Sequence, residues 1–308
     1  MNRFAAPRSI DEYLKQLRAR LEGEDPALIQ DALYDAEEYL RAEVAAHPDK
    51  SEADVLELIA STYGAPDEVA SAYRDTEAKV KAAMTTPRKV AKSGAGAFFG
   101  VFLDPRAYTS LFFMLLSLAT GIIYFTLTVT GLSLSAGLAV LIIGLPFFLV
   151  FVALTRVVSL AEGRLIEAMT GERMPRRPVH QSQAGFWSRV GQMLKDRRTW
   201  TTLAYLILML PLGVVYFVIA VVGLSVSLAF IFAPLVDWAG RYGWFDQAGD
   251  VHLNPEWLGT LWAAPLLVLA GVVLLTLLMH LARGVGRLHA MYAKALLVAP
   301  AAASAARS

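Results

Sequence analysis

Three long runs without a charged residue dominate this chain. They cover residues 107–155, 199–236 and 257–282, which are 49, 38 and 26 consecutive residues without Asp, Glu, Lys or Arg. A helix needs about 20 apolar residues to cross a hydrocarbon core of roughly 30 Å. Only helices and closed barrels satisfy every backbone polar group in lipid, and continuous apolar runs indicate helices. The sequence therefore predicts an all-α, polytopic membrane protein.

The first run is long enough for two spans, whereas each of the other runs holds one. A turn is expected at Gly-Leu-Ser-x-Ser, residues 131–135. The apolar piece at 228–236 is too short to cross, because nine residues of helix cover only about 14 Å. An outer insertion at about 228–262 is expected to fold over the outer surface. The predicted spans are 107–130, 136–156, 201–222 and 257–282.

Basic residues lie on one predicted side of the membrane. They precede the first span, follow the fourth and fill the stretch between the second and third, whereas the other side holds only Arg241. By the positive-inside rule, both termini and the middle loop are cytoplasmic. The first 25 residues carry no apolar core, so no signal peptide is expected. We predict a multi-pass membrane protein with cytoplasmic N- and C-termini.

An internal repeat runs through the membrane part. Residues 104–135 align with 196–227 without a gap, and 14 of 32 positions are identical. Each copy crosses twice, which predicts two parallel two-helix repeats related by an axis along the membrane normal. Pro211 has no counterpart at Ala119 and is expected to kink the third span. The signature residues of the two copies are Asp104, Arg106, Tyr124, Phe125, Gly131 and Ser133, and Asp196, Arg198, Tyr216, Phe217, Gly223 and Ser225.

The N-terminal part is an acidic, helical head. Residues 1–86 hold 10 basic and 18 acidic residues, a net charge of −8, whereas the remainder carries +9. Capping signals at Ser9, Asp25 and Ser51, and Gly64 before Pro66, divide the head into short amphipathic helices. The predicted organisation is a bundle at 1–77, a linker at 78–97, a membrane domain at 98–297 with repeats at 98–170 and 186–297, and a disordered tail at 298–308.

Two parts of the chain resemble known families. The head, with Tyr34-Asp35-Ala36-Glu37-Glu38-Tyr39 and Tyr63-Gly64-Ala65-Pro66, is similar to the HAAS signalling domain, which often occurs beside PadR-like transcriptional regulators. The membrane part, with the signature residues of both copies, resembles a four-span sensor domain of actinobacterial histidine kinases. These resemblances imply sensing and signalling in the bacterial inner membrane, and we expect no kinase region after the fourth span.

Candidate sites are few. Asp31, Asp35 and Glu38 share one helix face and are the candidate surface for a protein partner. Asp246, Asp250 and His252 have ligand types suited to a metal, but acidic loops are common and no metal is predicted. His280 is the only ionisable group inside a predicted span, and interfacial anchoring is the favoured role. Gly121, Gly213, Thr109 and Thr201 are expected to pack helices closely.

Three classes of function are compatible with this pattern. A signalling protein would relay envelope or lipid state from the membrane repeat to a cytosolic regulator. A permease or the membrane accessory of an ABC-type exporter, working with an ATPase, is the alternative. A lipid-modifying enzyme is disfavoured because no nucleophile motif, P-loop or paired buried carboxylates occur. We predict no enzymatic activity, no cofactor and no direct nucleic-acid binding; the oligomeric state stays open.

Opposite charges suggest a docked state. A linker of about 20 residues holds the acidic head close to the basic cytoplasmic edge of the membrane part, which raises their effective concentration. We expect Asp31, Asp35 and Glu38 to face arginines of the middle loop, Arg173, Arg176 and Arg177.

Overall fold

The computed structural model describes residues 6–84, 94–141, 143–177, 191, 193–241 and 263–298, and this part of the chain is all-helical. Two compact units can be distinguished. The first comprises residues 1–89, 130–205 and 290–308, and the second comprises residues 90–129 and 206–289. Three long helices run from one unit into the other. Each unit is described separately below.

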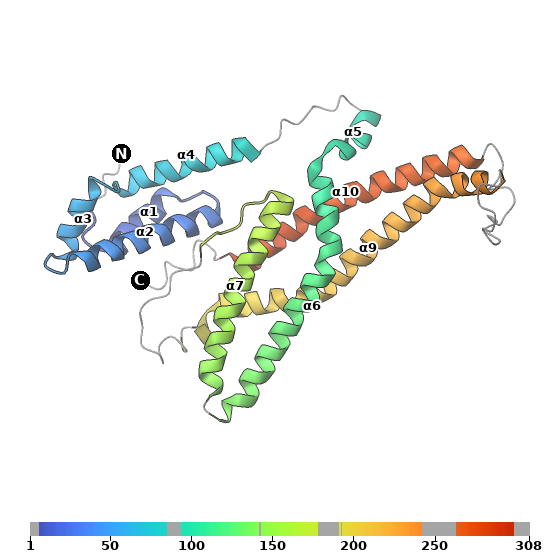
Figure 1. Cartoon of the computed structure of the whole chain (residues 1–308). Helices are drawn as coiled ribbons and strands as arrows, with labels where there is room; N and C mark the ends of the chain where they lie inside the picture. The colour runs from blue at the N-terminus through green and yellow to red at the C-terminus, as the bar shows by residue number, and fades with distance from the viewer. Residues whose placement is uncertain are drawn as a thin grey trace. The chain divides into compact units, whose positions relative to one another are not determined.

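The head in the first unit is a four-helix bundle. Its helices are α1 (Ile10–Arg20), α2 (Pro26–Ala46), α3 (Glu52–Ala60) and α4 (Pro66–Met84). The predicted caps form as expected: Ser9 and Asp25 accept backbone hydrogen bonds, and Ser51 forms a capping box with Asp54. In Figure 1 the head is blue to cyan, and α1 packs between α2 and α4. Residues 78–84, predicted as linker, continue α4 because they keep strong helix formers.

The head has its own apolar core, so it should fold independently. Leu17 is fully buried there among side chains of all four helices, whereas Leu58 is 49% exposed. Residues 1–84 alone are expected to give a helical circular dichroism spectrum. Leu17→Ala should lower the free energy of unfolding by about 2–5 kcal/mol in denaturant titrations, since it leaves a cavity. Leu58→Ala should change it by less than about 0.5 kcal/mol. A random-coil spectrum of the unmodified fragment would contradict this domain assignment.

Among the described residues, four helices are long and apolar enough to cross a membrane. They are α6 (Pro105–Ala139), α7 (Gly144–Thr170), the Arg197–Val236 part of α9 (Arg197–Arg241) and α10 (Ala263–Leu297). The chain is therefore a multi-pass membrane protein, with four candidate spans in the part that the structure describes. A short helix, α5 (Ala95–Phe99), and a 3-10 turn, η1 (Gly100–Leu103), precede α6. Within the first unit, the end of α6 from residue 130 forms a helical hairpin with α7, and within the second unit α9 lies antiparallel to α10 (Figure 1).

The predicted turns at Gly-Leu-Ser-x-Ser are wrong. Residues 131–135 lie inside α6, and the hairpin bends only after Ala139; residues 223–227 lie inside α9. The predicted lid residues 228–241 also continue α9, with Pro234 inside the helix. An unbroken helix satisfies its backbone groups in lipid, which outweighs the weak helix preference of Gly and Ser. Ser135 donates its hydroxyl hydrogen to the Gly131 carbonyl, 2.7 Å away, so its polar group also stays within the helix.

In the second unit, α6 and α9 cross at a pair of glycines. A Cβ added to Gly121 would lie 2.7 Å from the Met209 carbonyl oxygen, and one added to Gly213 would overlap the carbonyl oxygen of Ser117. In the repeat alignment Gly121 corresponds to Gly213, and Ser117 corresponds to Met209. The contact is therefore reciprocal, as a two-fold relation between the two predicted copies requires. Small residues at such crossings let the helix backbones approach closely.

Candidate functional site

The basic loop, residues 171–177, follows the C-terminal end of α7 and contacts the head within the first unit. Gly171 ends α7 in the left-handed conformation, with φ of 75°, which glycine adopts without steric cost. Met174 is fully buried and packs over Gly163 of α7, where a Cβ would lie 3.3 Å from the Met174 Cβ. The loop is therefore anchored on α7, which fixes the position of the arginines around Met174.

Asp31 of α2 is the centre of the contact. Its Oδ1 accepts hydrogen bonds from the backbone N–H groups of Arg176 (2.8 Å) and Arg177 (2.9 Å). Its Oδ2 accepts one from Nη2 of Arg173 at 3.0 Å. Asp31 is only 4% exposed. Burial raises the pKa of the Asp31 carboxyl, although the backbone donors and Arg173 act in the opposite direction. We call this arrangement of Asp31 and the basic loop the clamp.

Further ion pairs surround the clamp. Nε of Arg177 lies 2.8 Å from Oδ1 of Asp35, whose other oxygen accepts a hydrogen bond from the Tyr73 hydroxyl at 2.9 Å. Arg173 also pairs with Glu77 of α4. These contacts join α2 and α4 of the head to one loop, so the bundle is held at several points rather than at one exposed ion pair.

The head also touches the start of α9 and the end of α10. The Gln30 side chain donates to the Arg177 carbonyl at 2.6 Å and accepts from Nη1 of Arg198 at 3.4 Å. Nζ of Lys294 lies 2.5 Å from Oδ2 of Asp25, the N-cap of α2. The α2 helix thereby contacts residues attached to three of the four membrane helices.

Of the predicted partner face, Asp31 and Asp35 meet the basic loop, as the charge pattern suggests, whereas Glu38 is exposed one turn further along α2. Sequence reasoning did not place Asp25, Gln30 and Lys294 in the contact between the head and the membrane helices. The N-cap role of Asp25 was a visible signal, but nothing in the order of residues placed it beside the last turns of α10.

Ionisable residues inside the membrane helices are more numerous than the charge-free runs predicted. The helices α7 and α10 extend past those runs, so α7 contains Glu162 and α10 contains His289, and both are buried. Glu162 accepts a hydrogen bond from the Tyr205 hydroxyl at 2.9 Å. His280 bonds through Nε2 to the Phe98 carbonyl oxygen at 2.9 Å, which ties α10 to the short helix before α6.

Both copies of the Asp-x-Arg motif have the same local hydrogen bonds. Asp104 accepts from the backbone N–H of Arg106 at 3.0 Å, and Asp196 accepts from that of Arg198 at 3.1 Å. Thr109 and Thr201 donate to the carbonyls of these two arginines. A hydrogen bond from an aromatic side chain to the backbone six residues earlier also recurs. The Tyr108 hydroxyl donates to the Phe102 carbonyl, and the Trp200 indole N–H donates to the Leu194 carbonyl. The aspartates thus cap equivalent helix starts.

Their ion pairs differ. Asp104 pairs with Arg283 at 3.3 Å in the second unit, whereas Asp196 pairs with Arg156 at 3.7 Å in the first. Other signature residues are packing residues: Gly131 lies against the Phe151 ring, Gly223 against Leu278, and Tyr216 lies 3.5 Å from Nδ1 of His289.

No metal centre is found among the described residues, because no three His, Cys, Asp or Glu side chains there come together. Asp246, Asp250 and His252 lie outside the described residues, as do Tyr242, Trp244 and Phe245 of the outer stretch.

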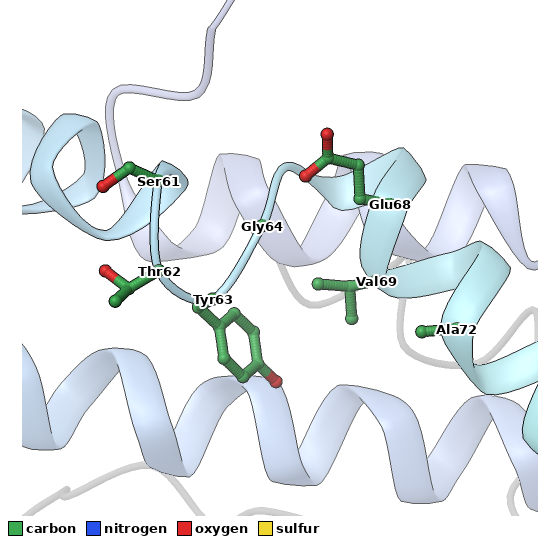
Figure 2. Close-up of a pocket in the computed structure, with 7 residues that line it drawn as sticks. All are labelled: Ser61, Thr62, Tyr63, Gly64, Glu68, Val69 and Ala72. Carbon is green, nitrogen blue, oxygen red and sulfur yellow. The ribbon is translucent and has the colours of Figure 1, made fainter.

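An open recess in the head is not a convincing binding site. Figure 2 shows it between the end of α3 and the start of α4, lined by Tyr63, Gly64, Glu68 and Val69 among others. The Tyr63 ring stacks on Tyr39, with ring centroids 4.4 Å apart. The Glu68 carboxylate accepts a hydrogen bond from the Ala65 backbone N–H at 3.2 Å. The main polar and aromatic groups of the recess thus already serve the fold.

Comparison with known families defines the class of protein. The model of the Putative sensor family matches residues 113–297, which is more than half of the chain and includes all or most of each membrane helix. The protein belongs to this family of membrane sensors. The head lies outside the matched residues. Neither the curated proteins nor the solved structures gave a match.

Proposed function

We propose that this protein is an inner-membrane sensor whose head reports the state of the membrane helices to a cytosolic regulator. The clamp carries this proposal, because one buried carboxylate joins the head to the loop after α7. The contacts of Gln30 and Lys294 extend the same surface to α9 and α10. Relative movement of these three helix ends would alter every one of these contacts together. Membership in the sensor family supports the same conclusion.

The head is the proposed output element. Its resemblance to the HAAS domain favours a transcriptional regulator, such as a PadR-like protein, as the partner. In the docked state Asp31 and Asp35 are occupied by the basic loop. Release would expose them beside Glu38 and create an acidic face for a basic surface of the regulator. The proposed role is non-enzymatic and requires no cofactor.

The proposed topology places both termini and the basic loop in the cytoplasm. Val140, in the bend between α6 and α7, is 86% exposed, and the chain has no native cysteine. In intact cells, a cysteine introduced by Val140→Cys should react with a membrane-impermeant thiol reagent, whereas one introduced by Ser182→Cys should react only after lysis. The reverse labelling pattern would contradict the topology and the cytoplasmic location of the clamp.

Docking can be measured directly in the full chain. Ala42 belongs to α2 of the head and Glu172 to the basic loop. Both are exposed, and both lie in the first unit. Spin labels at Ala42→Cys and Glu172→Cys would give a single short distance distribution when the head is docked. Release would add a broad, longer component in double electron–electron resonance. We refer to this readout as the docking distance.

The relay itself is tested by affinity capture. Full-length protein in nanodiscs would be incubated with cytosol of its host, as the unmodified chain, as Arg173→Ala, which leaves the acidic face of the head intact, and with residues 1–84 deleted. We expect one DNA-binding regulator to be enriched on Arg173→Ala and lost on deletion of the head. Enrichment of a transporter ATPase that does not depend on the head would favour the exporter accessory instead. No head-dependent partner in any sample would overturn the relay.

A further inference from the structure

The arginines of the clamp lie next to the first turn of a membrane helix. The Gln30 carboxamide contacts both the Arg177 carbonyl and the Arg198 guanidinium, so the basic loop and the start of α9 are close to each other. Trp200, in the same turn as Arg198, is 50% exposed, and its Nε1 donates to the Leu194 carbonyl. Exposed tryptophans of this kind prefer the headgroup level of a membrane. The basic loop is therefore close to where lipid phosphates would be.

The arginines differ in their accessibility. The Arg173 side chain, paired with Asp31 and Glu77, is 14% exposed. The Arg176 and Arg177 side chains are 48% and 51% exposed while they pair with Glu167 and Asp35. Of these two partners only Asp35 belongs to the head, because Glu167 lies in α7. A phosphate could approach the Arg177 guanidinium before the head has left, so exchange of that partner does not require a fully separated intermediate.

We propose that anionic phospholipid headgroups compete with the head for the arginines of the basic loop, so that anionic lipid releases the head. This inference rests on the proposed function and names its stimulus. Guanidinium groups bind phosphate and carboxylate by the same paired hydrogen-bond geometry, which makes the two ligands true competitors. A dissolved phosphate would offer the same chemistry. We commit to the lipid because the membrane concentrates it beside this loop.

At Arg177, whose pair with Asp35 is half exposed, the two competing interactions are of similar size. Each Lys or Arg near an anionic surface strengthens binding by about fivefold, and an exposed ion pair contributes between nothing and about the same factor. Asp31 is only 4% exposed in the docked state, so its charge keeps a desolvation cost there, and this burial raises the pKa of its carboxyl. Because the competing interactions are comparable in strength, the contact between the head and the basic loop should respond to lipid composition instead of staying permanently formed.

The test is the docking distance of the full chain in nanodiscs. In neutral phosphatidylcholine the head should be docked. Replacing an increasing share of that lipid by phosphatidylglycerol should raise the ratio of released to docked molecules at least about tenfold, because release frees the two guanidinium groups that pair with the head, those of Arg173 and Arg177. Inorganic phosphate, added to neutral nanodiscs at matched ionic strength, should have little effect. Equal release by phosphate, or no release by phosphatidylglycerol, would overturn the proposal.

Two variants make the test specific. Arg177→Gln should remove a large part of the dependence on phosphatidylglycerol, whereas Arg176→Gln, at the neighbouring arginine that pairs with Glu167 of α7, should keep it. An equal loss in both variants would show general charge attraction and would contradict the assigned site. Asp31→Lys in neutral nanodiscs separates this inference from the proposed function. If that variant is released while lipid composition has no effect, the lipid proposal alone fails; if it stays docked, the switch itself fails.

Discussion

Asp31→Lys should release the head from the basic loop even in a neutral membrane. The substitution removes the acceptor of three hydrogen bonds and places an ammonium beside Arg173, whose side chain is only 14% exposed. Removing one partner of a buried ion pair costs about 3–5 kcal/mol, because the other charge is left buried without compensation. Since every 1.4 kcal/mol is a factor of ten, the docked-to-released ratio should fall more than about a hundredfold. The docking distance measures this change.

Matched variants separate charge from folding. Glu38→Lys makes the same change on the same helix at an exposed position, and it should leave the docking distance unchanged. Arg173→Ala removes the partner from the loop side and leaves the head intact, so it should also release the head, by a smaller factor. Unchanged docking in both Asp31→Lys and Arg173→Ala would show that the clamp does not hold the head.

Gly213→Ala should destabilise the crossing of α6 and α9. The added Cβ would overlap the carbonyl oxygen of Ser117, and a backbone atom cannot turn aside as a flexible side chain can. Inserting a methyl group into such a contact typically costs about 1–3 kcal/mol, because the helices must separate. Gly121→Ala, the corresponding change in the first predicted copy, should have a similar effect. Thermal unfolding in detergent, followed by circular dichroism, measures both.

The control for this crossing is another helical glycine of the same unit. A Cβ at Gly284 of α10 meets no atom within 4 Å. Gly284→Ala should therefore stabilise the protein by about 0.5–1 kcal/mol through the better helix preference of alanine. Gly213→Ala and Gly284→Ala each add one methyl group to a helical glycine, but their expected effects on stability have opposite signs. Equal, small effects at Gly213 and Gly284 would mean that the close approach of α6 and α9 is absent in the membrane.

Local structure in the head could be predicted residue by residue. Ser9, Asp25 and Ser51 stand where helices begin, and Gly64, with φ of 102°, stands where the backbone must adopt a left-handed conformation. These signals act within one helical turn, so the order of residues is sufficient to read them. The same reasoning failed at residues 131–135 and 223–227. There the glycine and serine signals are overruled by the surroundings of the helix, which a short motif does not contain.

The sequence by itself determined that the chain crosses a membrane with four helices and carries a helical, acidic head. Both properties follow from composition and periodicity along the chain. Opposite charge also indicated that Asp31 and Asp35 would meet basic residues of the middle loop. Only the tertiary structure decided that Asp31 is buried and accepts hydrogen bonds from two backbone N–H groups of the loop. It also decided that Gln30 and Lys294 take part in the contact and that Glu38 does not. Such contacts join residues more than a hundred positions apart, and their energies depend on burial and geometry that exist only after folding.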